Sequence, residues 1–322
     1  MRLVYSGILI VTALAWAVAQ WGDDAHWIVS LASSGATGTF ILPMGIVGAY
    51  LAFRKKWLDL GVCFAGSLAV LVLTGQFPVH IGADRAEMSV KIMTFNIEHG
   101  RHGVDKIAQL VKDEKIDAFG FQECGLGTDR AVIDKLKELL PEYHLFSDGS
   151  RTSGTRLNVV SERVLPLDDL PYSWTMLEQV VSIDGHTLRV LNAHSPSYLP
   201  DATLKRPVKD WFRRWGEVAR QQTGLIQYEL RSIKAEGLPT VLCCDMNMPP
   251  VGKRYKLVAN DGTDSFAAVG TGPGWTSPAV FPTRRIDYVW TFPGCQPTSS
   301  YVVNRLASDH AAVVTCVSFN RP

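Results

Sequence analysis

The sequence has 322 residues, and its 32 Lys and Arg against 31 Asp and Glu give a formal net charge of +1. This balance excludes a polybasic protein that binds nucleic acid through an excess of positive charge. A hydrophobic fraction of 47%, together with 27 Gly and 17 Pro, excludes a disordered or collagen-like chain. The length allows one large domain with an additional segment.

The first 80 residues contain three long runs without a charged residue, at 3–21, 27–53 and 60–80. A helix needs about 20 apolar residues to cross a bilayer, because lipid offers no partner to unpaired backbone groups. The pattern predicts three transmembrane helices at these positions. Residues 1–80 would then form a membrane anchor, and 81–88 a linker to the remaining chain.

The loops between these runs predict the orientation of the anchor. Arg54, Lys55 and Lys56 follow the second run, whereas the loop after the first run has no Lys or Arg. Cationic loops stay in the cytoplasm, so the chain after residue 80 is expected outside it, at the plasma or inner membrane. An alternative interpretation makes the first run a signal peptide cleaved near Ala17–Ala19, and it places the remaining chain on the same side.

Residues 89–322 alternate short apolar runs with amphipathic segments. The short runs predict strands at 90–97, 117–123, 157–161, 176–183, 188–194, 241–245, 286–292, 301–304 and 311–317. Apolar residues at helical spacing predict helices at 104–111, 132–140 and 211–235. Many strands with few helices indicate two packed sheets flanked by helices.

The cysteines give weaker information. The five that follow residue 88 cannot all pair with one another, because their number is odd. Cys295 and Cys316 are a candidate disulfide pair, whereas Cys243 and Cys244 lie in an apolar run and are expected to pack as small hydrophobic residues.

Polar residues stand where the predicted strands stop. They are Asn96, Glu123, Asn192 with His194, Asp245 with Asn247, Asp287, and Asp309 with His310. Their carboxylate and amide oxygens are hard ligands that suit Mg²⁺ or Mn²⁺. A hard cation combined with two imidazoles provides the charge neutralisation and proton transfer that phosphoester hydrolysis requires.

In this order, the clusters resemble the endonuclease/exonuclease/phosphatase superfamily, which includes deoxyribonuclease I-like nucleases, neutral sphingomyelinases and inositol-phosphate phosphatases. The resemblance runs from about Ser89 to Ser318. It implies an α/β (α+β) fold, a four-layer αββα sandwich of two mixed β-sheets, here preceded by the three transmembrane helices. The site would lie at one end of the sheets.

The resemblance also implies catalytic roles. Asp245 would orient or deprotonate the attacking water, supported by Asn247. His310 would donate hydrogen bonds to the phosphoryl oxygens and would be oriented by Asp287. His194 would stabilise charge or protonate the leaving group, since an unperturbed imidazole has a pKa of about 6.5.

The remaining residues would hold the metal ion and the substrate. Glu123 would be the main ligand of Mg²⁺ or Mn²⁺, helped by Asn96 and Asp309, and Asn192 would bind substrate. Glu98 is either a further metal ligand or an ordinary loop carboxylate.

The anchor favours a substrate in the bilayer, because a tethered site meets lipid headgroups at high effective concentration. The layout resembles VanJ-type glycopeptide-resistance proteins, which implies hydrolysis of a lipid phosphate or diphosphate such as undecaprenyl diphosphate. An extracytoplasmic nuclease acting on DNA or RNA is the second interpretation, disfavoured by the balanced charge. A catalytically inactive binding module is the third, and the sequence indicates no protein partner.

Overall fold

The computed structural model describes residues 7, 14, 17, 18, 22, 38–73, 77–80, 89–125, 130–167, 174–195 and 208–319. Most of the first predicted transmembrane helix, 3–21, and the whole predicted linker, 81–88, lie outside the described residues.

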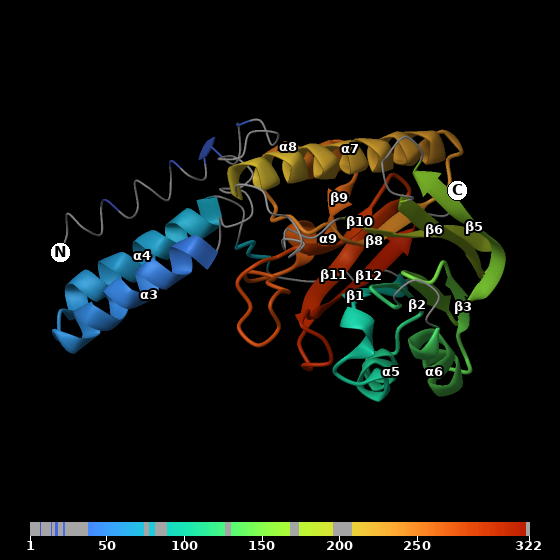
Figure 1. Cartoon of the computed structure of the whole chain (residues 1–322), viewed down its shortest axis with the longest axis horizontal. Coiled ribbons are helices and arrows are strands. Elements are labelled where there is room, and N and C mark those ends of the chain that lie inside the picture. The colour runs from blue at the N-terminus through green and yellow to red at the C-terminus, as the bar shows by residue number, and fades with distance from the viewer. Residues whose placement is uncertain are drawn as a thin grey trace.

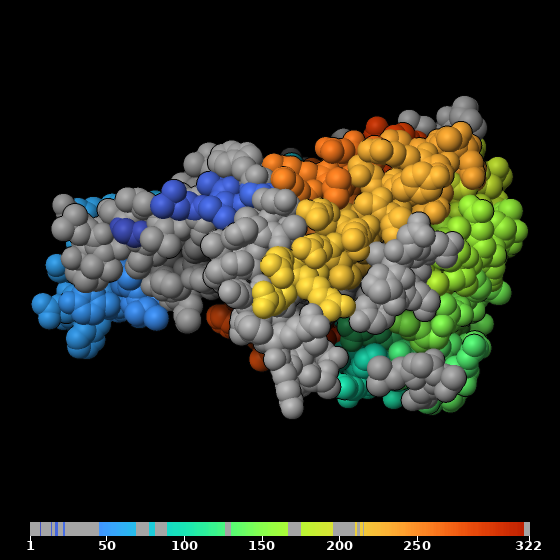
Figure 2. Space-filling model, turned by 45° about the horizontal axis from the view of Figure 1, so that its top comes forward, coloured from blue at the N-terminus to red at the C-terminus, as the bar shows by residue number. Residues whose placement is uncertain are grey.

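Two apolar helices precede the sheets. α3 (Gly38–Phe53) and α4 (Trp57–Leu73) lie side by side and project from one end of the molecule (Figures 1 and 2). They coincide with parts of the second and third charge-free runs, but have only 16 and 17 residues. Within the described part of the chain, no helix has both the length and the apolar character needed to cross a membrane.

The remaining described chain folds around two six-stranded mixed sheets. The first has the strand order β11 (Cys295–Val303), β12 (Ala312–Phe319), β1 (Ser89–Asn96), β2 (Ala118–Gln122), β4 (Thr152–Thr155) and β3 (His144–Ser147). The second has the order β5 (Asn158–Leu167), β6 (Trp174–Ile183), β7 (His186–His194), β8 (Thr240–Asp245), β10 (Asp287–Thr291) and β9 (Thr263–Asp264).

Helices cover the outer faces of both sheets (Figure 1). α5 (Val104–Asp113) and α6 (Ala131–Leu139) pack their apolar sides on the first sheet. On the second lie α7 (Val208–Ala235) and α8 (Gly252–Ala259), with the short α9 (Ser265–Val269) near its edge. The predicted αββα sandwich is confirmed for the described residues that follow the apolar helices.

β1 carries apolar side chains on both of its faces because it lies in the middle of the sandwich. Side chains alternate across a strand, so Met93 and Phe95 pack towards the helices while Val90 and Ile92 pack between the sheets. A strand buried on both faces needs apolar residues at successive positions. The burial of these side chains holds β1 in place, and with it the position of Asn96 at its end.

The two sheets approach closely near the middle. A Cβ atom on Gly120 would lie 2.7 Å from Cβ of Cys243, so only a glycine fits there without movement of the neighbouring chain. Next to it, Gln122 Nε2 donates to Asn192 Oδ1 at 2.9 Å, which links β2 to β7 across the gap. These contacts hold the two sheets in one alignment.

Some elements differ from the sequence prediction. The sequence analysis did not predict β3, β4, β9, α8 or α9, and the strand expected at 157–161 continues to Leu167. The proposed Cys295–Cys316 disulfide is wrong, because all six cysteines of the chain are described and are free. In the β11–β12 ladder, Cys316 faces Ser299 and Cys295 faces Phe319, so the two thiols belong to distant positions.

Candidate active site

The strand directions bring the predicted polar residues to one end of the sandwich. In the first sheet β1 and β2 are parallel, so Asn96 and Glu123 emerge at the same edge, and β12 begins there because it runs antiparallel to β1. In the second sheet, the register pairs both His194 and Asp287 with Asp245. Each sheet therefore contributes about half of the site.

Asp245 lies at the centre of this cluster and is fully buried. Asn96 Nδ2 donates to Asp245 Oδ2 at 2.9 Å, and the backbone N–H of Asn247 donates to Asp245 Oδ1 at 2.8 Å. His194 Nε2 lies 3.7 Å from Asp245 Oδ2, and His310 Nδ1 lies 3.9 Å from the same oxygen. The structure therefore brings together these five predicted residues.

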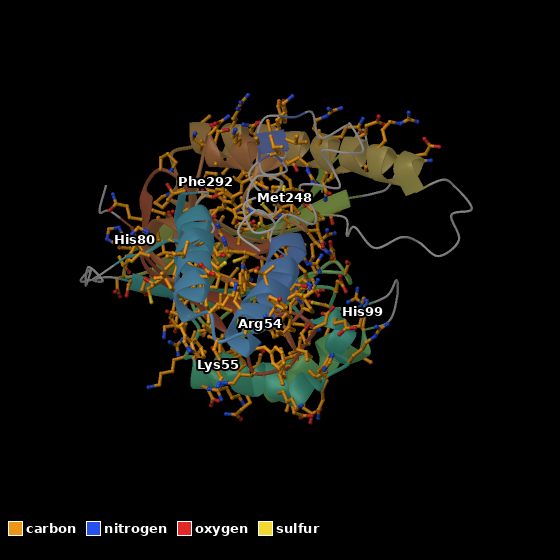
Figure 3. The ribbon with its side chains drawn as sticks, turned by 90° about the vertical axis from the view of Figure 1, so that its left-hand side faces the viewer. Arg54, Lys55, His80, His99, Met248 and Phe292 are labelled. Carbon is orange, nitrogen blue, oxygen red and sulfur yellow. The ribbon has the colours of Figure 1, made fainter. Side chains whose placement is uncertain are left out.

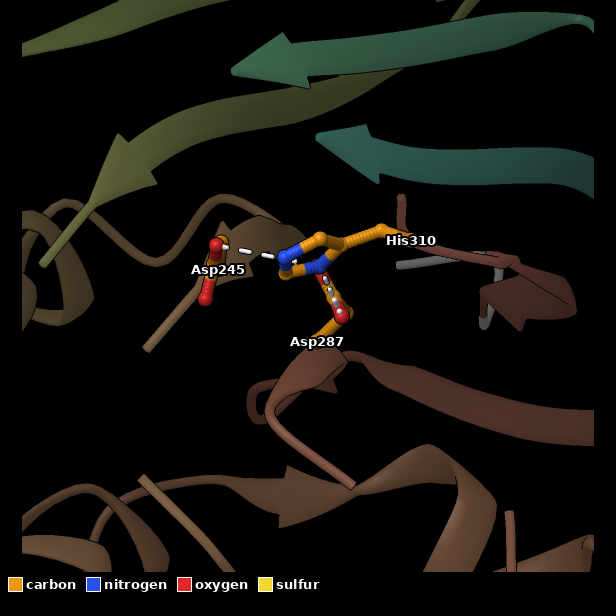
Figure 4. Close-up of side chains that lie close together, drawn as sticks. All are labelled: Asp245, Asp287 and His310. Atoms are coloured by element: carbon orange, nitrogen blue, oxygen red, sulfur yellow. Dashed lines mark hydrogen bonds and ion pairs between the residues drawn. The ribbon is translucent and has the colours of Figure 1, made fainter. Parts of the chain in front are cut away.

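Asp287 and His310 form a pair that crosses between the sheets (Figure 4). The two atoms His310 Nδ1 and Asp287 Oδ2 are 2.9 Å apart, and both side chains are buried. The backbone N–H of His310 also donates to Ser308 Oγ at 3.2 Å, which fixes the segment before β12. Asp287 is thus placed to orient the imidazole, as predicted.

The charges in this cluster shift the proton affinities strongly. Burial opposes a charged imidazole, but the adjacent Asp287 and Asp245 carboxylates outweigh it and raise the pKa of His310 to about 10. Burial, and then the neighbouring Asp287 carboxylate, raises the pKa of Asp245 to about 7. At neutral pH, His310 is therefore a cation, and Asp245 is close to its titration point, as a general base requires.

The environment of His194 favours the first of its two predicted roles, stabilising charge, over protonating the leaving group. Burial, followed by the positive charges of Arg151 and His310, lowers the pKa of His194 to about 3. Asn247 Nδ2 lies 3.3 Å from His194 Nε2, and Gln222 Nε2 donates to the His194 carbonyl at 2.7 Å. The imidazole is therefore uncharged at neutral pH and acts through hydrogen bonds.

Carboxylates gather on the side of the first sheet. Asn96 Nδ2 donates to Glu123 Oε1 at 3.0 Å, and the Glu98 backbone N–H donates to Asn96 Oδ1 at 3.1 Å. The pKa of Asp309 is raised overall. Loss of hydration is the main cause, and the Glu98 and Glu123 carboxylates add to it, while the charge of His310 acts in the opposite direction. A hard divalent cation among Glu123, Asn96 and Asp309 would neutralise this concentration of negative charge.

A second geometric grouping could also hold a cation. One ligand atom from each of Asp245, Asp287 and His310 lies within 4.8 Å of the others. Its histidine is already protonated and paired with Asp287, so a metal ion there would have to displace a proton. Mg²⁺ prefers oxygen ligands, which Glu123, Asn96 and Asp309 would supply without a histidine.

Asn192 is not brought to the site surface. It is fully buried between the sheets, where its Nδ2 donates to the carbonyls of Phe121 and Thr152, both at 3.1 Å. Its Oδ1 accepts the hydrogen bond from Gln122. With its amide engaged in this way, Asn192 links the sheets, which differs from the predicted role in substrate binding.

His99 was missed by the sequence analysis (Figure 3). Its backbone N–H donates to the Glu123 carbonyl at 2.7 Å, and its Nε2 lies 3.6 Å from Glu123 Oε2. Glu98, His99 and Glu123 all have positive φ angles, which non-glycine residues seldom adopt. The position of His99 three residues after Asn96 was the available signal in the sequence, but a lone loop histidine rarely carries function.

Asp287→Asn is expected to move the alkaline limb of the pH–kcat profile at least about one unit towards neutral pH. The Asp287 carboxylate raises the pKa of His310, so its removal lets the imidazolium deprotonate at a lower pH. Measuring kcat from pH 6 to 10.5 at saturating Mg²⁺ tests this. Superimposable profiles would show that cationic His310 is not required for turnover.

The profile of the "Endonuclease/Exonuclease/phosphatase family" matches residues 93–310, more than half of the chain. The chain belongs to this family. Members of the family hydrolyse phosphoric ester bonds, so the protein is a phosphoesterase. The matched region begins in β1 and ends at His310, and therefore contains every predicted site residue.

Solved structures share the family fold. An endonuclease/exonuclease/phosphatase from Bacteroides vulgatus is 18% identical, with a TM-score of 0.58, covering 73% of this chain and 100% of that one. A mannosyl-6-phosphatase from Bacteroides thetaiotaomicron has the same identity and TM-score, covering 71% and 100%. D. rerio TDP2, complexed with a single-strand DNA product, is 16% identical with a TM-score of 0.56, covering 72% and 100%. No curated protein matches the sequence.

Proposed function

We propose that the protein is a divalent-metal-dependent phosphoesterase, held at a membrane, that hydrolyses a lipid phosphate or diphosphate outside the cytoplasm. Undecaprenyl diphosphate is an example of such a substrate. The observation that carries the chemistry is the network around Asp245, in which a buried carboxylate and a cationic imidazole face a group of oxygen ligands.

In the proposed reaction, different side chains accept the proton and stabilise the negative charge. Asp245 accepts a proton from the attacking water, and Asn96 and Asn247 fix the position of its carboxylate. Cationic His310, oriented by Asp287, donates to the phosphoryl oxygens on which negative charge develops. Neutral His194 contributes hydrogen bonds to the same region.

We place the divalent cation beside Glu123 and Asn96, which are hydrogen-bonded to each other, with Asp309 as a further oxygen ligand. When bound, Mg²⁺ or Mn²⁺ neutralises phosphate charge. Asn96 orients Glu123 through the hydrogen bond between Nδ2 and Oε1, at 3.0 Å.

The apolar helices support placement at a membrane. Val47, Leu51 and Cys63 pack between α3 and α4, but Phe53 and Leu58 are 83% and 77% exposed. Further exposed apolar side chains are Ile46, Trp57, Val62, Phe64 and Leu68. An exposed apolar surface of this kind is typical of protein or membrane contact. The charge-free sequence runs of 27 and 21 residues are longer than the two helices and favour the bilayer.

Arg54 and Lys55 indicate which way the chain would lie. They occupy the turn between α3 and α4 (Figure 3). We expect this turn in the cytoplasm and the sheets outside it. Alkaline phosphatase fused to the carboxyl terminus should be active, and green fluorescent protein fused there should be dark. The opposite pair of results would refute the orientation.

The substrate class is tested by phosphate release from undecaprenyl diphosphate, phospholipids, inositol phosphates and DNA, with and without Mg²⁺. We expect the long-chain diphosphate to be hydrolysed with a shallow salt dependence and faster than a short-chain analogue. A nuclease that neutralises several phosphates would instead lose affinity steeply as salt rises. Efficient Mg²⁺-dependent DNA cleavage at physiological salt would reverse the assignment in favour of a nuclease.

A further inference from the structure

A pocket of about 520 Å³ lies between α9, β11 and the loop that precedes Arg285. Its apolar wall consists of Phe266, Pro273, Trp275, Phe281, Pro282 and Tyr301. None of the lining residues that the structure describes carries a charge. The size and composition are typical of a site for an apolar ligand rather than for a phosphate group.

The loop that forms one wall of the pocket is bonded to the active site. The backbone N–H of Ala279 donates to the Asp309 carbonyl at 2.6 Å, and that of Ala311 donates to the Thr276 carbonyl at 2.7 Å. These two bonds flank His310 in the sequence. The segment that holds the catalytic imidazole and the wall of the pocket therefore form one hydrogen-bonded unit.

The floor of the pocket also connects to the catalytic centre. The Arg285 guanidinium lies over the Phe266 ring, 5.6 Å from its centroid. Arg285 precedes Asp287 by two residues and is ion-paired with Asp264 at 2.6 Å. An apolar ligand lying on Phe266 would thus contact a ring that packs on Arg285, the residue next but one before β10.

The part of the loop at Thr271 and Gly272 bonds to the segment that follows the apolar helices. Gly272 N–H donates to the Pro78 carbonyl at 3.0 Å, and Thr271 Oγ1, from a lining residue, donates to the His80 carbonyl at 2.9 Å. Figure 3, which views the molecule from the α3–α4 end, shows His80 on the face turned towards that end. The loop around the pocket is therefore bonded to the segment that links the apolar helices to the sheets.

We propose that this pocket binds the hydrocarbon chain of the lipid substrate while its phosphate lies at His310. The inference rests on the proposed function and adds to it a binding site for the hydrocarbon chain of the substrate. Phe281 and Tyr301, which are 69% and 36% exposed, would lose contact with water when a chain enters. The hydrogen bonds from the surrounding loop to the segment of His310, and to the segment that follows the apolar helices, favour a substrate chain.

Photolabelling tests the inference without turnover. The full chain in phosphatidylcholine nanodiscs, with Mg²⁺, is irradiated with a long-chain alkylphosphonate that carries a diazirine at the chain end, and labelled peptides are mapped by mass spectrometry. We expect labelling within 266–283 and 301–302, suppressed by excess unlabelled dodecylphosphonate and not by methylphosphonate. Labels confined to α3 and α4 would overturn the inference.

Two neighbouring substitutions separate pocket binding from general membrane contact. Phe281→Ser should reduce labelling of the pocket about tenfold, equivalent to about 1.4 kcal/mol of binding free energy. Val280→Ser should leave it unchanged, because Val280 is 83% exposed but does not line the pocket. Equal losses in both variants would mean that the loop only touches the bilayer, and would overturn the inference.

The outcomes also separate the inference from the proposed function. Specific pocket labelling without hydrolysis of any lipid phosphate supports chain binding and removes the proposed reaction. Hydrolysis of lipid phosphate by a protein whose pocket is never labelled leaves the reaction standing and overturns the inference.

Discussion

Asp245→Asn is expected to lower kcat by at least about a hundredfold, the usual lower scale for removing a general base. The substitution keeps the shape of the side chain but replaces one of the two accepting oxygens with an amide NH2, and it removes the group that accepts the proton from water. Steady-state phosphate release at saturating Mg²⁺ measures the loss. Near-normal turnover by Asp245→Asn would show that another group activates the water.

The stability of the same variant provides the control. A carboxyl whose folded pKa is raised weakens the fold as pH rises from its unfolded pKa towards the folded value. The pKa of Asp245 rises from 3.8 to about 7, so ionised Asp245 destabilises the fold at and above neutral pH. Denaturant unfolding of Asp245→Asn at pH 8 in EDTA should therefore give a free energy close to that of the unmodified chain, because removal of the buried charge offsets the loss of one hydrogen-bond acceptor.

Asp264→Ala is expected to reduce the free energy of unfolding by about 3–5 kcal/mol, the scale for breaking a buried ion pair. Arg285 and Asp264 are both buried, with Nη1 and Oδ2 2.6 Å apart. The same carboxylate accepts a hydrogen bond from Tyr255 Oη at 2.7 Å. Its loss would leave the Arg285 guanidinium charged without its carboxylate partner beneath the start of β10.

Glu138→Ala is the matched control for this measurement. Glu138 also forms an ion pair, with Lys135 Nζ at 3.0 Å, but its side chain is 68% exposed. Exposed pairs contribute little to stability, because solvent screens them. Denaturant unfolding should therefore separate the two variants clearly. Similar losses in both would mean that burial does not set the contribution of the Arg285 pair.

The sequence was informative where a polar residue follows an apolar strand. Asn96, Glu123 and Asp245 each stand at such a position, and the sheet directions bring strand ends of this kind to one edge. The order of these clusters carried the family resemblance and with it the layer structure. The prediction succeeded because strand periodicity is a local property, whereas the family resemblance supplied the long-range pairing.

The burial of each side chain and the charges around it could not be predicted from local sequence patterns. His194 and His310 look equivalent in the sequence, yet their pKa values move in opposite directions: burial lowers that of His194, whereas the hydrogen-bonded Asp287 carboxylate outweighs burial at His310. Asn192 and His194 share one face of β7, but His194 ends the strand, whereas Asn192 lies one repeat deeper between the sheets. The position along the strand therefore decides which of them reaches the site.

β4 shows a different limit. Its four residues, Thr152–Thr155, are fully buried but contain no aliphatic or aromatic side chain, so no apolar periodicity marks the strand. Gly154 is required because a Cβ atom there would lie 2.2 Å from the Phe119 ring. The strand forms because of its neighbours in the fold, and local sequence patterns do not contain that information.

Because the site is divided between the two sheets, recovery of activity during refolding reports on the docking of the sheets. Asn96, Glu123 and His310 come from one sheet, and His194, Asp245 and Asp287 from the other. Neither half contains both the carboxylate that accepts the proton and the imidazolium that binds the phosphoryl group. A chain in which each sheet has formed but the two have not yet docked is therefore inert. Turnover that returns during refolding therefore comes only from molecules whose sheets have docked. Secondary-structure spectroscopy alone does not distinguish docked sheets from undocked ones.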